Sequence, residues 1–283
     1  ITEHAEDLVA NTPDARYNSS EVIAWLEALV RTSTAALTAA RKTTNRTPRF
    51  RRAEEDILIL NGLGLYYANL FRAALLYSIH EQTHDPAAAT QSLASLRKAR
   101  VAWATMATRA RKVYASDISY GAPPIRRGHW ADRLPAIDAD IAALQAHFAA
   151  QPQAQQSSAA QAIQLVANPT QRLTVDATHT PPETFHPRSN LALAITTPST
   201  IVQAVLWYRH VNQAERWTST PMHQAPAPTQ SNVNTAAIPA ACTDSPYPLQ
   251  YYFELRTARA ATLHPPFNPT LSNQPYYAIY NRT

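Results

Sequence analysis

The chain has 283 residues, 45% of them hydrophobic, and a formal net charge of +5 at pH 7. This length suits about two domains of ordinary size. The modest charge argues against nucleic-acid binding unless the basic side chains gather on one face. No apolar run approaches the roughly 18–20 residues that a membrane span needs, and the single cysteine, Cys242, excludes an internal disulfide.

Residues 1–150 are predicted to form an all-α helical bundle, because hydrophobic residues recur there with a helical period. Asn18 and Glu21 have the spacing of a helix cap, so a helix is expected to follow to about Thr43. The pair Asp85-Pro86 places an N-cap acceptor before a proline at the first helical position, and it predicts the start of another helix.

The predicted helix over residues 50–84 is apolar on nearly its whole circumference, which is typical of the buried centre of a bundle. Gly62 and Gly64 each weaken a helix by about 1 kcal/mol relative to alanine. Close approach of neighbouring helices would compensate for that loss. Arg72 lies on the same helix and, if buried, requires an acidic partner that the sequence does not identify.

The helix predicted after Pro86 has a basic outer side, formed by Arg97, Lys98, Arg100, Arg109, Arg111 and Lys112. Such a side can meet phosphate or an anionic surface. Aromatic residues do not alternate with these charges, as they do in proteins that bind single strands. We therefore expect a solvated face and no nucleic-acid partner.

The loop DISYGAPPIRRGHWADR, residues 117–133, concentrates more chemistry than any other window of the chain. Its prolines exclude a continuous helix, and Trp130 is expected to anchor it. The binding candidates in this loop are Asp117, Tyr120, Arg126, Arg127, His129, Trp130 and Asp132. The alternative is that these side chains only cap helices and tie the loop to its neighbours.

A change of composition marks the second half of the chain. Residues 151–170 are rich in Gln, Ala and Ser and are predicted to be a linker. Over residues 171–283 the hydrophobic period becomes two, which predicts an immunoglobulin-like or fibronectin-III-like β-sandwich. The expected strands cover residues 172–177, 190–196, 203–211, 215–222, 232–238, 249–256 and 276–281.

Three residues of this predicted sandwich, Tyr208, Arg209 and Trp217, are further binding candidates. Exposed aromatic rings with hydrogen-bonding side chains beside them are suited to holding sugars. Half of the side chains in any strand face the core, however, so core packing is the alternative for each aromatic residue. Cys242 falls in a turn region, where an inert thiol is the usual finding.

The sequence His80-Glu81-Gln82-Thr83-His84 matches the HExxH pattern, in which two histidines bind zinc and the glutamate acts as a base. Asp117 is the candidate third ligand. The motif ends against Asp85-Pro86, where a helix is expected to stop and the second histidine would lie in a fraying turn. A zinc-dependent hydrolase with Glu81 as catalytic residue is therefore the alternative function. The leading hypothesis requires no cofactor and no catalytic residue.

Two parts of the chain resemble a known kind of protein. The segments ILNGLGLYYANLFRAALLYSIHEQT (59–83) and VYASDISYGAPPIRRGHWADRLPAIDADI (113–141) resemble a helical region near the C-terminus of large exported bacterial proteins that act on carbohydrates. The segments WYRHVNQAERW (207–217) and IPAACTDSPYPLQYYFELR (238–256) resemble the immunoglobulin-like domain that follows that region.

This resemblance implies a non-catalytic accessory region that supports or extends a glycan-active enzyme, for example a glycoside hydrolase. The expected partners are other domains of a larger parent protein and carbohydrate. The expected location is outside the cytoplasm of a bacterium. The chain begins at Ile1, and we expect it to be a processed protein or a region excised from a longer one.

Overall fold

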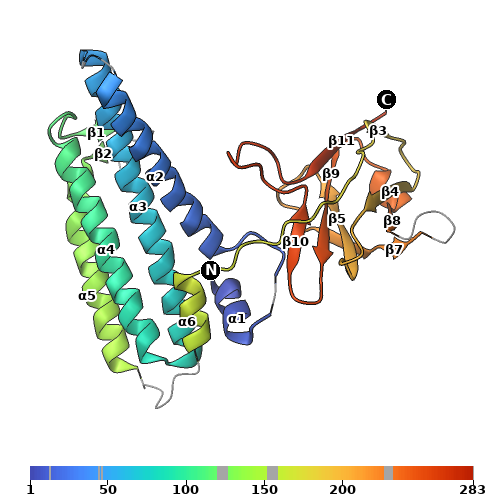
Figure 1. Ribbon diagram of the computed structural model, residues 1–283, viewed down its shortest axis with the longest axis horizontal. Helices are drawn as coiled ribbons and strands as arrows, with labels where there is room; N and C mark the ends of the chain where they lie inside the picture. Colours follow the sequence, from blue (N-terminus) through green and yellow to red (C-terminus); the bar gives the residue numbers. More distant parts are fainter. Residues whose placement is uncertain are drawn as a thin grey trace. The chain divides into compact units, whose positions relative to one another are not determined.

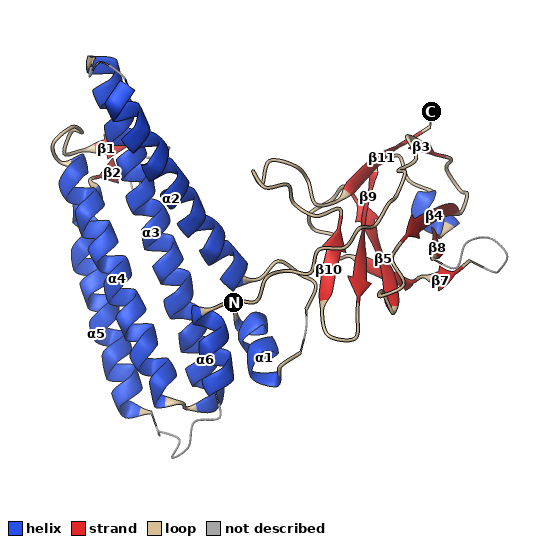
Figure 2. Ribbon diagram, viewed as in Figure 1, coloured by secondary structure: helices blue, strands red, loops and turns tan. Residues whose placement is uncertain are grey.

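The computed structural model describes residues 1–12, 14–43, 45, 47–119, 127–151, 159–225 and 232–282. The chain forms two compact units. The first, which we call the helical unit, contains residues 1–12 and 17–170. The second, the sheet unit, contains residues 13–16 and 171–283. Helices thus precede strands (Figure 2), as the change of hydrophobic period predicts.

The helical unit is built from long antiparallel helices, with α3 packed against both α2 and α4 and with α5 packed against α4 (Figure 1). The helices are α1 (Thr2–Ala10), α2 (Ser19–Thr43), α3 (Pro48–Thr83), α4 (Pro86–Ala110), the 3-10 helix η2 (Trp130–Arg133), α5 (Leu134–Ala150) and α6 (Ala160–Ala167). A short hairpin of β1 (Ile118–Ser119) and β2 (Arg127–Gly128) precedes η2. No helix among the described residues combines the length and the apolar character that a membrane crossing requires.

The predicted helix starts are confirmed by side-chain caps. The amide N–H of Asn18 donates to Glu21 at 2.9 Å, and the amide N–H of Glu21 donates to the Asn18 side chain at 3.0 Å. This is the reciprocal arrangement of a capping box. At the start of α4, the Asp85 carboxylate accepts from the amide of Ala87 at 2.8 Å, directly across Pro86.

The two helical glycines lie where neighbouring helices approach α3 most closely. A Cβ atom at Gly62 would lie 2.8 Å from Cβ of Met106 on α4. A Cβ atom at Gly64 would lie 2.9 Å from Cγ2 of Val30 on α2. The expectation of close helix approach at these positions is therefore confirmed, and it explains why α3 contains residues with poor helix propensity.

Arg72, also on α3, finds its acidic partner on α2. Its Nη2 atom lies 2.7 Å from Oε1 of Glu27, and both side chains are only partly exposed. The pair joins residues 45 positions apart. It fixes the register of the two helices at the end where α2 begins.

The prediction of a linker over residues 151–170 is wrong for its second half. Residues 160–167 form α6, in which Ala162, Ile163 and Val166 are buried against Leu75 and Ile79 of α3. These three residues have helical spacing, so one side of a short helix is apolar. The linker was predicted from the abundance of Gln, Ala and Ser, and the helical spacing of the apolar residues was not taken into account.

The sheet unit contains a six-stranded sheet and a three-stranded sheet. The six-stranded sheet has the order β3-β11-β9-β5-β6, with β10 also paired to β9, and the three-stranded sheet has the order β4-β8-β7. The strands are β3 (Thr184–Phe185), β4 (Leu191–Thr196), β5 (Gln203–His210), β6 (Thr218–Pro221), β7 (His223–Gln224), β8 (Val233–Ile238), β9 (Leu249–Arg256), β10 (Ala261–His264) and β11 (Tyr277–Asn281). A one-turn helix, α7 (Ala240–Thr243), precedes β9.

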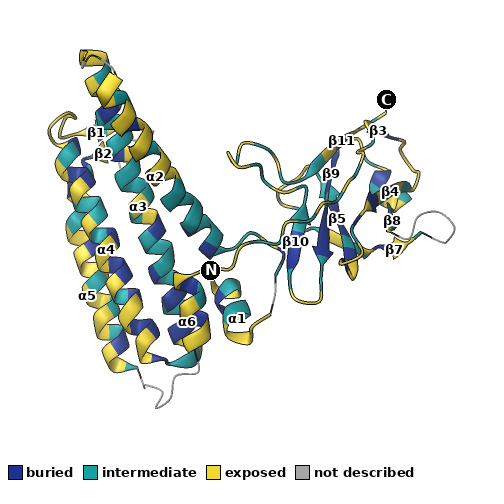
Figure 3. Cartoon of the chain, in the orientation of Figure 1, coloured by how far each residue is buried: buried dark blue, intermediate teal, exposed yellow. Residues whose placement is uncertain are grey.

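Both sheets contribute to one hydrophobic cluster. Leu206 on β5 and Phe253 on β9 meet Ile195 on β4 and Ile238 on β8 in this cluster, and all four are buried (Figure 3). The side chains of β5 alternate between this core and the opposite face of the sheet. The alternation follows from the period of two in an extended strand.

Most predicted strands form within one to three residues of their expected bounds, but one does not form. Residues 172–177 were expected to be a strand, and the structure has only an isolated bridge nearby, between Thr178 and Thr196. The side chain of Arg172, at the start of this segment, donates to a distant part of the chain, as described below. Three short strands, β3, β7 and β10, lie where no strand was predicted.

Candidate functional site

The outer face of the six-stranded sheet carries three aromatic rings, which we call the aromatic platform: Trp207, Trp217 and Tyr252. Trp207 on β5 stands directly opposite Tyr252 on β9. Their rings are nearly parallel, at 12°, with centroids 6.2 Å apart. Trp217 approaches the Tyr252 ring edge-on at 4.7 Å. The pairing of β5 with β9 brings Trp207 to Tyr252, and the residue before β6, Trp217, completes the group.

Buried polar groups hold the platform in place. The indole Nε1 of Trp207 donates to Oε2 of Glu254 at 2.8 Å. Glu254 is only 7% exposed and forms an ion pair with Arg256, so its buried charge is compensated. Burial and the nearby Glu254 carboxylate raise the pKa of Tyr252 to about 12, so its hydroxyl keeps its proton. The rings are thus oriented by contacts within the sheet.

Arg209 lies at the edge of the platform, with its guanidinium carbon 4.5 Å from the centroid of the Trp217 ring. Its Nη1 atom donates to the backbone oxygen of Glu215 at 3.0 Å. The side-chain oxygen of Gln250, in the amide orientation that satisfies both groups, accepts from Nε at 2.5 Å and from Nη2 at 2.9 Å. A stacked and hydrogen-bonded guanidinium is held in one orientation.

An N-terminal segment of the chain belongs to the sheet unit. Arg172 donates from Nη1 to the backbone oxygen of Ala15 at 2.5 Å and from Nη2 to that of Arg16 at 2.7 Å. Arg16 in turn pairs with Asp14 at 2.7 Å. The side chain of Arg172 therefore helps to hold this segment to the rest of the unit.

Tyr208, a binding candidate from the sequence, is not part of the platform. It is 6% exposed and belongs to the hydrophobic cluster to which both sheets contribute. Its neighbours Trp207 and Arg209 point to the other face, as strand alternation requires. For Tyr208, core packing is the correct interpretation. Arg209 and Trp217, the other two candidates, do lie together.

The structure brings Cys242 close to a histidine and a carboxylate, a grouping that sequence reasoning missed. His210 Nδ1 lies 2.9 Å from Oε2 of Glu215, while His210 Nε2 lies 3.9 Å from the Cys242 sulfur and 2.9 Å from its backbone oxygen. Burial, with a smaller effect of Glu215, raises the pKa of the Cys242 thiol. The contacts of His210 with Glu215 and with the Cys242 backbone oxygen join β5 to the loop after it and to α7.

Two charged side chains described in the loop at residues 117–133 pair with each other. Arg127 pairs with Asp117 across the β1–β2 hairpin, with both side chains more than half exposed. An exposed pair of this kind contributes about 0–1 kcal/mol. Tyr120 and Arg126, also binding candidates, lie outside the described residues.

The remaining candidates of that loop have structural contacts. The amide of His129 donates to Asp132 at 2.7 Å, and His129 Nδ1 accepts from the amide of Ala131 at 3.0 Å, so the two side chains cap η2. The carbonyl oxygen of Trp130 accepts from Nε1 of Trp103 at 2.7 Å. Trp130 is partly buried and packs against the hydrophobic cluster formed by Ile59 of α3 with Met106 and Ala110 of α4. These contacts match the capping alternative for the loop.

The HExxH residues do not form a ligand set. His80 is fully buried, and its Nδ1 atom lies 2.9 Å from the backbone oxygen of Asp85. Glu81 is hydrogen-bonded by His147 on α5 at 2.9 Å, and this bond is the main cause of its lowered pKa. His84 follows the end of α3 in the left-handed conformation, with φ of 54°.

Asp117, the candidate third ligand, lies beyond the far end of α4, so it is separated from His80 and His84 by the length of that helix (Figure 1). A helix of 25 residues is about 37 Å long. Among the residues that the structure describes, no three His, Cys, Asp or Glu side chains gather in a way that holds a metal ion.

The basic side of α4 is partly neutralised. Arg100 makes two hydrogen bonds to Asp138 on α5, at 2.7 and 2.9 Å. Arg109 pairs with Glu55 on α3 at 2.6 Å. Several of its cations therefore join helices of this unit, which weakens the case for a phosphate-binding face.

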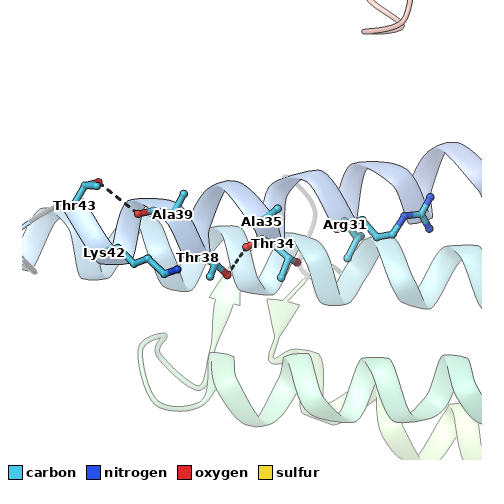
Figure 4. A pocket seen from close by; sticks show the side chains of 8 residues that line it. Arg31, Thr34, Ala35, Thr38, Ala39, Lys42 and Thr43 are labelled. Atoms are coloured by element: carbon cyan, nitrogen blue, oxygen red, sulfur yellow. Dashed lines mark hydrogen bonds between the residues drawn. The ribbon is translucent and has the colours of Figure 1, made fainter.

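An open groove of about 680 Å³ runs along α2. Figure 4 shows Arg31 and Lys42 near its two ends, with small side chains between them. The hydroxyls of Thr38 and Thr43 donate to backbone oxygens one turn earlier on the same helix, at 2.8 and 3.5 Å. Few polar groups remain to orient a ligand, so the aromatic platform is the stronger candidate site.

Two comparisons with known proteins bear on identity. No protein-family model matches this chain, and no curated protein matches its sequence.

Proposed function

We propose that the chain is a non-catalytic accessory region of an exported bacterial carbohydrate-active protein, and that it binds glycan on the aromatic platform of the sheet unit. The observation that carries this proposal is the near-parallel pair of Trp207 and Tyr252 rings on the outer face of the sheet. Sugar rings present flat C–H faces that pack on aromatic rings, while hydrogen-bonding groups at the edge orient their hydroxyls. Arg209 lies at that edge.

The proposal includes an immunoglobulin-like or fibronectin-III-like β-sandwich as the scaffold of the site. Its support is the single hydrophobic cluster to which β4, β5, β8 and β9 all contribute. In such a scaffold one face of each sheet packs inward and the other remains free for binding. Trp207 on β5 and Tyr252 on β9 are partly exposed and lie on the face opposite the buried residues of these strands.

The proposal assigns binding rather than turnover because of the state of the nearest carboxylate. Glycoside hydrolysis generally uses two carboxyl groups on opposite sides of the scissile bond. Glu254, the carboxylate beside the platform, is buried, accepts from Trp207 and is paired with Arg256. It is therefore committed to holding the rings. The helical unit is proposed to connect the sheet unit to other domains of the parent protein.

A binding assay tests this function. The chain is run in native gels that contain soluble polysaccharides, and the intrinsic tryptophan fluorescence is titrated with the same polymers. Trp217→Ala and Tyr252→Ala are each expected to weaken binding by about tenfold or more, since a central aromatic contact contributes upwards of 1 kcal/mol. Tyr280→Ala is the matched control, because Tyr280 is an exposed ring, at 63%, on β11 of the same sheet.

Two results would contradict the proposal. The first is that no polysaccharide retards the chain or changes its fluorescence. The second is hydrolysis of a glycan substrate by the purified chain at a constant specific activity through successive purification steps. Loss of binding in Tyr280→Ala to the same extent as in the platform variants would place the site elsewhere on the sheet.

A further inference from the structure

The charges around the platform do not cancel. Four charged groups act on the hydroxyl of the platform tyrosine: Glu254, Arg16, Arg209 and Asp14. Glu254 pairs with Arg256, and Arg16 pairs with Asp14. Arg209 pairs with no acidic side chain in the part of the chain that the structure describes. One guanidinium charge at the edge of the aromatic platform is therefore uncompensated.

The hydrogen bonds of Arg209 leave a defined set of donors free. A guanidinium has five N–H groups. One on Nη1 donates to the backbone oxygen of Glu215, while Nε and one N–H of Nη2 donate to Gln250. All of these acceptors are neutral. One N–H remains on each terminal nitrogen, and a guanidinium can donate from its two terminal nitrogens to the two oxygens of a carboxylate.

We propose that the platform binds an acidic glycan, and that the carboxylate of a uronic acid residue pairs with Arg209 while its ring packs on the neighbouring aromatic side chains. This inference rests on the proposed glycan-binding function and specifies its ligand class. Trp217 holds the guanidinium by stacking at 4.5 Å, so the charge is positioned before ligand arrives. Preorganisation of this kind lowers the entropic cost of binding.

The test compares two forms of one polymer. Polygalacturonate is titrated beside the same polymer after chemical reduction of its carboxyl groups, so that chain length and linkage are matched. We expect the acidic form to bind about tenfold more tightly or better, because a charge-assisted bidentate pair contributes binding free energy of that size. Raising the salt concentration is expected to weaken only the acidic form, because salt screens a partly exposed pair.

Substitutions test whether the preference for the acidic polymer depends on Arg209. Arg209→Gln is expected to bring the affinity for the acidic polymer down to that of the reduced polymer, and Arg209→Lys to restore part of it without the fork. Arg188→Gln is the control cation, because Arg188 is a largely exposed arginine of the sheet unit that pairs with Asp244. The comparison of the two polymers on the unaltered chain remains informative if a variant fails to fold.

The outcomes separate this inference from the function on which it rests. Equal binding of the acidic and reduced polymers overturns the uronate assignment and leaves glycan binding intact. Binding of polyglutamate, a polycarboxylate without sugar rings, as tightly as polygalacturonate also overturns it, since charge alone then suffices. Binding of neither polysaccharide overturns both proposals.

Discussion

Replacing Gly62 by alanine is expected to lower the free energy of unfolding of the helical unit by about 1–2 kcal/mol. The added Cβ would lie 2.8 Å from Cβ and 3.3 Å from Cγ of Met106, whereas carbon atoms in good contact are about 3.5–4.0 Å apart. Met106 is 1% exposed, and its Cβ is fixed to the backbone of α4. A change of rotamer therefore cannot relieve the contact, and the two helices must separate.

The magnitude follows from two opposing effects. Overpacking a tight core costs about 1–3 kcal/mol, and alanine returns up to about 1 kcal/mol through its better helix propensity. We place the cost of overpacking in the upper part of its range because the contact joins two Cβ atoms. The net loss of stability is then about 1–2 kcal/mol. Most glycine-to-alanine changes inside helices stabilise the protein, so the predicted loss of stability is specific to Gly62.

Gly64→Ala is the matched control. Its added Cβ would meet only Cγ2 of Val30, at 2.9 Å, and this methyl group belongs to a side chain that is only partly buried. A small movement of Val30 relieves the contact, so a change within about 0.5 kcal/mol of the wild type is expected. Urea denaturation followed by the helical circular dichroism signal measures both variants. A Gly62→Ala protein as stable as Gly64→Ala would refute the reasoning.

Three further predictions concern stability. Trp130→Ala should cost about 2 kcal/mol in urea denaturation, less than the roughly 3–5 kcal/mol of a fully buried tryptophan, because Trp130 is only partly buried; an unchanged midpoint would reject its anchoring role. Arg72→Ala should cost about 1 kcal/mol, and in the double variant with Glu27→Ala the two effects should not add. Burial lowers the pKa of His179 and of His264 in the folded chain. As the pH falls, the unfolded chain therefore binds protons at these two histidines before the folded chain does. The sheet unit should then be most stable above about pH 6.5 and lose stability below it, and equal urea midpoints at about pH 7.5 and about pH 5.5 would contradict this.

The long helices could be predicted because their signals are local. Asp85 and Pro86 lie next to each other in sequence, and the cap that they form needs no distant partner. The close approach at Gly62 could also be inferred, since a helix tolerates glycine where a neighbour packs tightly. The partner of Arg72 could not, because Glu27 lies 45 residues away and only the register of α2 on α3 selects it.

The difference between local signals and long-range partners also explains the errors of prediction in the second half of the chain. Residues 172–177 alternate as a strand should, but a strand also needs a partner edge, and the structure has only an isolated bridge next to this segment, between Thr178 and Thr196. Alternation along β5 accounts for Leu206 and Trp207 lying on opposite faces of the sheet. It could not place Trp207 opposite Tyr252, which depends on the pairing of β5 with β9.

The contrast between the two candidate regions explains why the sheet unit is the better assignment. The loop at residues 117–133 holds more functional side chains per residue, and several of those that the structure describes have partners nearby: Arg127 pairs with Asp117, and the Asp132 carboxylate accepts from the amide of His129. The Nε2 atom of His129 is nevertheless buried with no hydrogen-bond partner among the described residues, so the loop is not fully satisfied. At the platform, Arg209 pairs with no acidic side chain of the described residues and has two N–H donors left after its contacts with them. An uncompensated charge beside oriented aromatic rings, rather than density of chemistry in the sequence, is what supports the proposed binding site.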